Sequence, residues 1–403
     1  MHDLLDGAPK TMPLSGNSMK KRLALVRGPN LNAWEMQSFT PLLDTFDIVG
    51  FTSYGHNFDV CAIPFQVKRL FSFGQFLRPR PVRSSLSRLF GDYHDLQGLD
   101  NALRGFDIVH SAETFYYCTY QTARLRHSNR FKLVVTVWEN IPFLNETAAQ
   151  RAIKTSVFEA ADLFLAVSSR AREALILEGV PEQKIKVQIP GVDLQRFRPA
   201  PKDDQLLRLF RCSPNDLIIL FVANLCREKG VFDLVYAFRR VVDRLGKERQ
   251  LKLLLGGRGR EETRISELIR RLQLEDSARL IGSFPYSSVP QLHNIADIFV
   301  LPSIPTPMWQ EQFGYVLVES MACGKPVIST LSGAIPEVVA DAGVLVPPND
   351  FFSLANALED LISDEKKRAE LGQRSRRRAE EVFDSRRVAL ELKNHYQALL
   401  SNE

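Results

Sequence analysis

Residues 298–328 read IFVLPSIPTPMWQEQFGYVLVESMACGKPVI and contain the pattern that decides the fold. The continuous apolar run Ile298–Leu301 predicts a buried strand, and a Pro-rich loop follows it. Gly314 then precedes a segment of helical length that begins at Tyr315, and a second apolar run begins at Pro326. A buried strand, a helix and a second buried strand in this order are typical of a parallel α/β sheet.

Short apolar runs alternate with helix-length segments over the whole chain from Arg22 onward. The runs are continuous rather than alternating, as is typical of parallel strands that are covered on both faces. We predict strands at Leu23–Val26, Phe46–Phe51, Asp107–His110, Lys132–Val137, Leu163–Val167 and Lys184–Ile189 in the first half, and at Leu217–Val222, Leu251–Leu255, Arg279–Ile281, Ile298–Leu301, Pro326–Ile328 and Gly343–Val346 in the second. The pattern therefore predicts two doubly wound, Rossmann-like α/β domains.

A Pro-rich charged stretch at residues 198–204 separates the two halves and is typical of a linker. We expect an N-terminal domain over residues 21–200 and a C-terminal domain over residues 201–383. A helical segment over residues 384–403 follows, and its apolar stripe consists of Val388, Leu390, Leu392, Tyr396 and Leu399. Residues 1–20 are polar and turn-rich and lack the apolar core of a secretion signal, so we expect a disordered tail there.

The composition narrows the classes of function. The 403 residues include 52 Lys and Arg against 47 Asp and Glu, and a net charge of +5 is too small to indicate a nucleic-acid partner. Five cysteines without a C-x-x-C pair argue against a disulfide scaffold or a zinc site and favour a reducing compartment. No run approaches the roughly 18–20 apolar residues of a membrane-spanning helix. We therefore expect a cytoplasmic protein that binds no nucleic acid.

Two glutamates flank the turn before the helix predicted at Tyr315. Gly314 permits close approach of a ligand to the backbone, and the free N–H groups at a helix start suit phosphate. Glu311 before the helix and Glu319 inside it are good acceptors for hydroxyl groups. A ligand that has both phosphate and several hydroxyl groups fits this pattern. The alternative is an ordinary helix start with a surface glutamate.

A second charged cluster follows the predicted strand Leu217–Val222. Arg227 and Lys229 lie near the carboxyl end of this strand, where ligands of open α/β sheets bind, and can neutralise a diphosphate. Arg258 belongs to the glycine cluster Gly256–Gly259 after the next strand, which is not the GxGxxG pattern of dehydrogenases. The alternative for this cluster is a loop of solvated charges.

These segments together resemble the retaining glycosyltransferases of family 4, which have the GT-B fold. The resemblance extends over nearly the whole chain from Arg22. Its markers are Ala161-Asp162, Ala166-Val167-Ser168, Ile189-Pro190-Gly191-Val192-Asp193, Phe197-Arg198-Pro199, Phe221–Leu225, Lys229-Gly230-Val231, Ile281-Gly282-Ser283, Ala296–Ser303, the pair Glu311 and Glu319, and Ser332–Glu337. Because so many markers occur in the order of the family, the chain is identified as a member.

The resemblance implies two Rossmann-like domains that face a central cleft and a nucleotide-diphosphate-sugar donor bound mainly by the C-terminal domain. It implies that Arg227 and Lys229 neutralise the diphosphate and that Glu311 binds the sugar, which makes these three the expected catalytic residues. The other expected donor-binding residues are Asn224, Arg258, Gly282, Ser283, Phe313, Gly314, Tyr315, Val316 and Glu319. The resemblance also implies no metal, no cofactor, and a final helix that packs back on the N-terminal domain.

The resemblance further implies transfer of a hexose with retention of configuration to a sugar, polyol or lipid-linked acceptor. Two departures from the family pattern open an alternative, however. Asn224 stands where the family usually has an arginine, and an amide cannot neutralise phosphate. The family often has the motif Thr-x-His-Asp at the end of the predicted strand Lys132–Val137. Here Thr136 and Val137 are followed by Trp138-Glu139-Asn140. The alternative is a nucleotide-sugar-binding protein of the same fold without turnover, whereas the residues of a GT-B epimerase or phosphorylase are not evident.

The expected acceptor-side residues follow the predicted N-terminal strands. They are Gly28, Asn30, His110, Glu113, Trp138, Glu139 and Asn140. For His110 the alternative is a structural role.

Residues 68–90 form a basic, aromatic segment without any acidic residue. The segment contains Lys68, Arg69, Arg78, Arg80, Arg83 and Arg88 together with Phe71, Phe73, Phe76 and Phe90. Such a segment can lie on an anionic membrane surface, contact a phosphorylated acceptor, or cover the domain as a packed loop.

Overall fold

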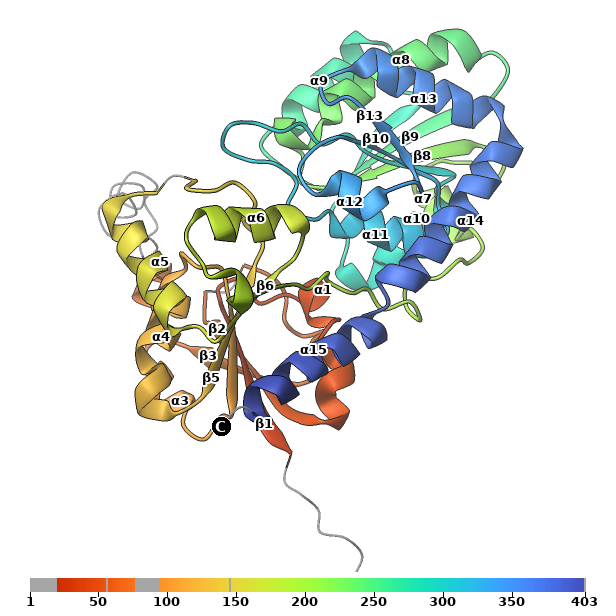
Figure 1. Cartoon of the computed structure of the whole chain (residues 1–403). Coiled ribbons are helices and arrows are strands. Elements are labelled where there is room, and N and C mark those ends of the chain that lie inside the picture. Colours follow the sequence, from red (N-terminus) through yellow and green to blue (C-terminus); the bar gives the residue numbers. More distant parts are fainter. Residues whose placement is uncertain (1–19, 56, 77–93, 145, 402–403) are drawn as a thin grey trace, which may run out of the picture.

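The chain forms two parallel β-sheets that belong to separate halves of the sequence (Figure 1). The computed structural model describes residues 20–55, 57–76, 94–144 and 146–401. Within these ranges the first sheet has the strand order β3-β2-β1-β4-β5-β6-β7 and the second has the order β10-β9-β8-β11-β12-β13. All strand pairs within both sheets are parallel, so the prediction of two Rossmann-like α/β sheets is confirmed.

The N-terminal sheet is covered on both faces by apolar packing. Its strands are β1 (Lys21–Gly28), β2 (Phe46–Ser53), β3 (Gln66–Leu70), β4 (Ile108–Ala112), β5 (Lys132–Val137), β6 (Leu163–Ala166) and β7 (Ile185–Val187). Leu23 and Leu25 of β1 pack into one core cluster, whereas Ala24 and Val26 pack into another on the opposite face. Successive side chains of a strand point to opposite faces, so a strand covered on both sides is apolar without interruption.

The C-terminal sheet repeats this arrangement. Its strands are β8 (Leu217–Val222), β9 (Leu251–Gly256), β10 (Ala278–Gly282), β11 (Ile298–Leu301), β12 (Val327–Thr330) and β13 (Val344–Val346). Ile219 in β8 lies in register with Leu253 of β9 on one side and Ile298 of β11 on the other. These strands and the helices around them form one continuous apolar core.

The connections between strands are mainly helical. The α-helices are α1 (Ala33–Met36), α3 (Leu99–Ala102), α4 (Tyr117–Asn129), α5 (Ala148–Ala160), α6 (Ser169–Leu177), α7 (Asp204–Leu209), α8 (Val231–Leu245), α9 (Glu262–Arg271), α10 (Val289–Ile295), α11 (Tyr315–Ala322), α12 (Ile335–Val339), α13 (Phe351–Ser363), α14 (Glu365–Val382) and α15 (Ser385–Ser401). The 3-10 helices are η1 (Thr40–Asp44), η2 (Phe73–Phe76), η3 (Glu182–Lys184), η4 (Arg227–Lys229) and η5 (Tyr286–Ser288). Local sequence explains several helix starts; for example, Thr147 and Gln150 form a reciprocal capping box at α5.

Sequence periodicity located most of these elements and missed one. Each predicted strand overlaps a strand of the structure, and α11 begins at Tyr315 as predicted. Strand β3 was missed because it lies at the edge of its sheet and has no buried residue, so it lacks a buried apolar run. Lys68 and Arg69 of the basic, aromatic segment belong to this strand, whereas residues 77–93 lie outside the described residues.

Helix α15 packs against the N-terminal sheet although it follows the C-terminal domain in the sequence (Figure 1). Val388, Leu392 and Tyr396 lie in the same core cluster as Leu23. Leu390, by contrast, is 58% exposed, so its predicted place in the apolar stripe is wrong.

Gly191 lies against the start of helix α15. A Cβ atom on this residue would lie 2.6 Å from Cα of Ser385, so only glycine permits the approach of α15. The N–H of Ser385 donates to the carbonyl of Val192, and the N–H of Val192 donates to the carbonyl of Phe383. These contacts give the Pro-Gly-Val marker a structural role, which is to hold the start of α15.

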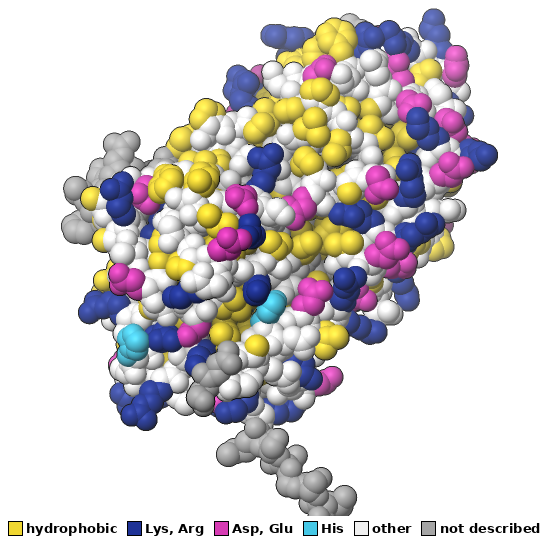
Figure 2. Space-filling model, viewed as in Figure 1, with side chains coloured by type: hydrophobic (Ala, Val, Ile, Leu, Met, Phe, Trp, Pro, Cys, Tyr) yellow, Lys and Arg dark blue, Asp and Glu magenta, His cyan; other side chains and the backbone are white. Residues whose placement is uncertain are grey.

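Among the described residues, no helix is both long and apolar enough to cross a bilayer. The face shown in Figure 2 carries interspersed basic and acidic side chains, in keeping with the small net charge.

Candidate functional site

The start of helix α11 lies between two buried glutamates. Gly314, with φ +88°, is the N-cap of the helix, and the first N–H groups of a helix have no partner within it. Glu311 is 6% exposed and Glu319 is 4% exposed. The alternative interpretation of a surface glutamate is therefore wrong for both residues. Phe313 and Tyr315 next to Gly314 are largely covered by their surroundings, and Val316 lies in the first turn.

Lys229, which follows β8, forms an ion pair with Glu311, which follows β11. The Nζ of Lys229 donates to both carboxylate oxygens of Glu311, over 3.0 Å to Oε1 and 2.7 Å to Oε2. The Oγ of Ser303 donates to Oε2 over 2.7 Å, and the ring of Trp309 lies 4.6 Å from Nζ. Gly230 makes this geometry possible, because a Cβ at its φ of +69° would lie 1.8 Å from the carbonyl oxygen of Pro302.

The other predicted cations lie nearer to solvent. The side chain of Arg227 is 61% exposed, and its Nε lies 3.8 Å from a carboxylate oxygen of Glu261. Arg258 and Asn224 are also exposed, and the N–H of Leu225 donates to the carbonyl of Arg258 over 2.9 Å. The loops after β8 and β9 are thus joined at the carboxyl ends of their strands.

Glu319 is engaged by residues that the sequence did not single out. The hydroxyl of Tyr286 donates to Oε1 of Glu319 over 2.6 Å, and the amide of Gln37 in the N-terminal domain donates to that hydroxyl over 2.7 Å. Burial, followed by the charge of Glu319, raises the pKa of Tyr286 well above its usual value, so the phenol stays a donor. The buried ring of His293 lies 3.8 Å from the other carboxylate oxygen. Tyr286 lies four residues after Gly282, which has φ +75° and precedes Ser283.

The loop after β5 contacts the segment before α11 across the domain interface. Nδ2 of Asn140 donates to the carbonyl of Glu311 over 3.0 Å, and Nε2 of Gln310 donates to the carbonyl of Asn140 over 3.1 Å. The ring centroid of Trp138 lies 5.6 Å from that of Tyr315. The departure Trp138-Glu139-Asn140 thus lies opposite the predicted donor-binding segment.

The buried carboxyl group of Glu113 and the half-buried one of Glu139 hold this loop. Oε1 of Glu113 accepts a hydrogen bond from the N–H of Trp138 over 3.0 Å, and Oε1 of Glu139 accepts from the N–H groups of Asn140 and Ile141 over 2.9 Å each. Burial, followed by the charge of Glu139, raises the pKa of Glu113 to about 8. Burial also raises the pKa of Glu139.

His110 has a structural role. It is fully buried; its Nδ1 shares a hydrogen bond with the hydroxyl of Tyr396, and its Nε2 shares one with the hydroxyl of Thr136, both over 2.6 Å. Burial, followed by the charge of Arg27, lowers the pKa of His110 well below its usual value, so the ring is neutral. The ring therefore links the sheet to α15, which is the alternative that the sequence left open.

The remaining acceptor-side residues lie at the end of β1 and in the loop after it. Gly28 has φ +54°, and a Cβ there would lie 3.2 Å from Sγ of Cys118. The side-chain oxygen of Asn30 accepts a hydrogen bond from Nδ2 of Asn57 over 2.9 Å.

A buried ion pair, which the sequence pattern did not predict, joins the end of β1 to α1. Arg27 is 1% exposed, and its Nε donates to Glu35 over 2.8 Å. Its Nη1 donates to the carbonyl of His110 over 2.7 Å, and its Nη2 has no hydrogen-bond partner among the described residues. The usable signal was the position of Arg27, a charged residue directly after the buried run Leu23–Val26.

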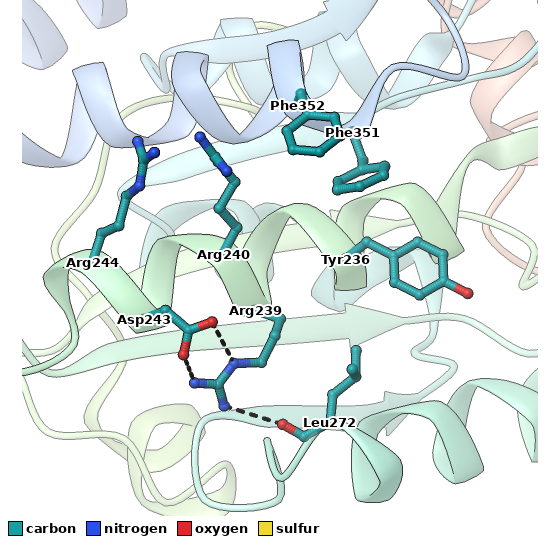
Figure 3. A pocket seen from close by; sticks show the side chains of 8 residues that line it. All are labelled: Tyr236, Arg239, Arg240, Asp243, Arg244, Leu272, Phe351 and Phe352. Carbon is teal, nitrogen blue, oxygen red and sulfur yellow. Dashed lines mark hydrogen bonds and ion pairs between the residues drawn. The ribbon is translucent and has the colours of Figure 1, made fainter.

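A cavity of about 530 Å³ lies on the outer side of the C-terminal domain, between α8 and the start of α13 (Figure 3). Its cations are already paired: Arg239 donates to Asp243 and to the carbonyl of Leu272, and Arg244 donates to Glu359 over 2.7 Å. None of its lining residues is a predicted site residue, and α8 and α13 lie at the end of the domain far from the N-terminal sheet (Figure 1). This cavity is therefore not the predicted donor site.

Within the described parts of the chain, no group of three or more His, Cys, Asp or Glu side chains is placed to hold a metal ion. The predicted independence from metals stays a prediction.

Two family models cover most of the chain. Residues 210–378 match the model "Glycosyl transferases group 1", and residues 50–196 match the model "Glycosyltransferase Family 4". Together with the two-sheet architecture, these matches show that the chain belongs to the group 1 (family 4) glycosyltransferases, with the GT-B fold. The family prediction is confirmed.

Curated relatives and solved structures agree with this assignment. The chain is 35% identical over 249 residues to the putative colanic acid biosynthesis glycosyltransferase WcaL of Escherichia coli K12, an alignment that covers 60% of this chain and 58% of that protein. It is 29% identical over 298 residues to N-acetyl-alpha-D-glucosaminyl L-malate synthase of Bacillus anthracis, covering 73% and 75% respectively. The chain thus spans little more than half the length of WcaL.

Among solved structures, Anabaena HepE in complex with UDP and glucose aligns with a TM-score of 0.75 at 20% identity, over 94% of this chain and all of that one. Sucrose-phosphate synthase of Thermosynechococcus elongatus aligns with a TM-score of 0.74 at 20% identity, over 95% and 100%. These two likenesses support the fold.

Proposed function

We propose that the chain transfers a hexose from a nucleotide-diphosphate sugar, with retention of configuration, to a sugar, polyol or lipid-linked acceptor. The observation that carries the proposal is the Lys229–Glu311 pair beside the start of α11. A cation, free helix N–H groups and a hydroxyl-binding carboxylate meet there. A nucleotide-diphosphate sugar has the phosphate and hydroxyl groups that such a site binds.

The charge changes of the reaction assign a role to each group. Breakage of the bond between the sugar and the diphosphate leaves negative charge on the leaving group and positive charge on the sugar. Lys229 and the first N–H groups of α11 stabilise the leaving group, and Arg227 adds a more exposed cation. Glu311 binds sugar hydroxyls and is held by Ser303. The acceptor hydroxyl attacks the same face of the sugar, and its proton passes to the departing phosphate oxygen, which retains the configuration.

The nucleoside part of the donor is assigned to the residues around Glu319. We assign the ribose to this carboxylate and the base to the main chain around Gly282 and Ser283, with Asn224 and Arg258 at the adjacent loops. Tyr286 already donates to Glu319, so the ribose hydroxyls share or replace that hydrogen bond. Because HepE was solved with UDP and with UDP-glucose, UDP-glucose is the first donor to test.

The acceptor is assigned to the loops of the N-terminal domain that face this site. Asn140 and Trp138 contact the segment 311–315 directly, and Glu139 lines a small cavity of about 110 Å³ with Lys154. The curated relatives are named for different acceptors, such as L-malate and D-inositol 3-phosphate, so their names leave the acceptor open.

Incubation with UDP-, GDP- and ADP-sugars tests the proposal. Release of the nucleotide diphosphate, with a sugar attached to an acceptor in the same anomeric configuration, supports it. The alternative, a binding protein without turnover, is motivated by Asn224 and Trp138. Calorimetric binding of a nucleotide sugar without product over hours supports that alternative and contradicts the proposal.

We also propose contact between the basic, aromatic segment and an anionic membrane. In its described part, Phe73 is 62% exposed, Phe71 is 39% exposed, and Lys68 and Arg69 lie nearby on the exposed strand β3. Sedimentation with phosphatidylglycerol vesicles at low salt tests this contact, with neutral phosphatidylcholine vesicles as the control. Equal sedimentation with both vesicles, or with neither, contradicts it.

A further inference from the structure

Glu113 combines burial with an unusual backbone conformation at the carboxyl end of β4. It has φ +59°, a left-handed value that is uncommon for a residue other than glycine. It is 4% exposed, and its Oε2 has no hydrogen-bond partner among the residues that the structure describes. Strained backbone and an unsatisfied buried polar atom both carry a free-energy cost, and such features cluster at functional sites.

The backbone and side chain of Glu113 extend the sheet beyond its last regular pair. The N–H of Glu113 donates to the carbonyl of Thr136 over 2.8 Å, which continues the ladder between β4 and β5. Its Oε1 then accepts the N–H of Trp138, in the place where a carbonyl of a longer β4 would accept it. The carboxyl group thereby fixes the backbone at the start of the turn 138–141.

This turn contacts the proposed donor site directly. Asn140 donates to the carbonyl of Glu311, and the Trp138 ring packs against Tyr315 and Phe313 at centroid distances of 5.6 and 6.3 Å. The side chain of Glu113 therefore reaches Glu311 through one turn of main chain and two hydrogen bonds. A shift of that turn moves the carbonyl contact and the aromatic packing together.

We propose that Glu113 is a positioning residue, which holds the turn 138–141 against Glu311 and Tyr315 and so orders both the sugar side and the diphosphate side of the donor site. The proposal rests on the proposed function, because it takes the segment 311–319 as the donor site. It gives a role to the departure Trp138-Glu139-Asn140, which replaces the family pattern at this turn.

The protonated form of Glu113 fits this role. Burial and the nearby charge of Glu139 raise its pKa to about 8, while the backbone N–H groups of Trp138 and Glu139, and then the charge of Lys154 on α5, oppose the shift. Lys154 is itself paired, over 2.6 Å with Glu178 and over 3.7 Å with Glu146. Loss of the proton above this pKa places a charge on a carboxyl group whose Oε2 has no described partner, so we expect the turn to loosen as the pH rises.

The variants Glu113→Gln and Glu113→Ala separate the positioning role of Glu113 from a general contribution to the stability of the fold. The glutamine keeps an oxygen that accepts the N–H of Trp138 and carries no charge, whereas alanine removes the acceptor. We expect Glu113→Ala to lower kcat at least tenfold and to weaken UDP binding, and Glu113→Gln to stay within about threefold of the parent chain at pH 7. Glu159→Gln, an exposed change of the same kind on α5, is the control and is expected to match the parent.

The pH profile gives the decisive readout. We expect activity of the parent chain to fall as the pH rises through about 8, and this fall to be absent in Glu113→Gln. A fall of the same size in Glu113→Gln overturns the proposal, as does Glu113→Ala with parental kcat and UDP affinity. If Glu113→Ala does not fold, the profile of Glu113→Gln still decides.

A third measurement separates this proposal from the proposed function. Calorimetry measures the affinity for UDP from pH 7 to 9, and tryptophan fluorescence is recorded over the same range. Neither measurement requires turnover. If the parent chain transfers no sugar but its UDP affinity falls above pH 8 and that of Glu113→Gln does not, the proposed function fails and the positioning role stands. If affinity and fluorescence are insensitive to pH in both chains, the positioning role is overturned.

Discussion

Replacement of Lys229 is the sharpest perturbation of the proposed site. Its Nζ lies 2.7 and 3.0 Å from the two oxygens of Glu311 and 4.6 Å from the Trp309 ring centroid, and its side chain is 20% exposed. The variant Lys229→Ala removes the charge and the aliphatic stem together. Lys229→Met removes the charge and keeps a long apolar side chain beside Trp309. Comparison of the two separates charge from packing.

The expected kinetic effect follows from the charge on the leaving group. Removal of one preorganised group that stabilises transition-state charge lowers kcat about 10²–10³-fold, or about 2.7–4 kcal/mol. Both variants are expected to show this loss, because both lack the cation. KM for the donor is expected to change less than kcat, since the charge on the diphosphate grows as the sugar bond breaks.

The expected effect on folding is smaller than the effect on catalysis. Breaking a fully buried ion pair costs about 3–5 kcal/mol. Lys229 is partly exposed and Ser303 continues to donate to Glu311, so a loss of about 1–2 kcal/mol in the free energy of unfolding is expected. Urea denaturation measures this quantity independently of turnover.

The assay measures release of UDP from UDP-glucose under initial-rate conditions, with Lys366→Ala as the matched control. Lys366 is 88% exposed on α14, and its ion pair with Glu370 is at the surface, so its removal is expected to leave kcat unchanged. Parental kcat in both Lys229 variants refutes the assignment of this cation to the leaving group. A loss in Lys229→Ala that Lys229→Met restores would instead show that packing against Trp309 is what matters.

Three further changes test other parts of the structure. Gly191→Ala places a Cβ 2.6 Å from Cα of Ser385, so we expect urea denaturation to show a loss of about 1–3 kcal/mol, and an unchanged midpoint contradicts the close contact. Glu35→Gln removes the charge that pairs with the buried Arg27, and we expect a loss of about 3–5 kcal/mol by the same method, whereas an effect below about 1 kcal/mol refutes a buried pair. Tyr286→Phe removes the hydroxyl between Gln37 and Glu319 and frees Oε1 for the ribose, so we expect tighter binding of UDP by calorimetry, and weaker binding would show that the hydroxyl assists the nucleotide.

Local periodicity was sufficient to predict the sheets. The buried strands are continuous apolar runs, and α8 buries the residues Val231, Leu234, Val235, Phe238 and Val241 that occur at helical spacing. Strand β3 was not predicted because it lies at a sheet edge and has no buried residue. Its hydrogen bonds to β2, rather than burial, define it as a strand. Leu390 was misplaced because a helical stripe predicts a face but not where that face ends.

Polar contacts within the site were only partly predictable. The proximity of Lys229 to Glu311 followed from the family pattern and from the meeting of strand ends in parallel sheets. In the link from Gln37 through Tyr286 to Glu319, Gln37 and Tyr286 are 249 positions apart, and nothing in the local sequence indicates such a pairing. Glu113 was named for its position after a strand, whereas its left-handed backbone and its bond to Trp138 arise from tertiary packing.

The positions of the Lys229–Glu311 and Arg27–Glu35 ion pairs support a role for both pairs in ligand binding. A buried ion pair is often no more stabilising than a well-packed apolar pair, so stability of the fold alone does not explain Lys229–Glu311 or Arg27–Glu35. Arg27 lies at the carboxyl end of β1, Lys229 and Glu311 follow β8 and β11, and the loops after β5 and β11 contact each other through Asn140. If these charges are kept for the ligand, UDP should stabilise the parent chain against urea more than it stabilises Lys229→Met. Equal stabilisation of both chains would mean that the Lys229 charge serves the fold and that the diphosphate binds elsewhere.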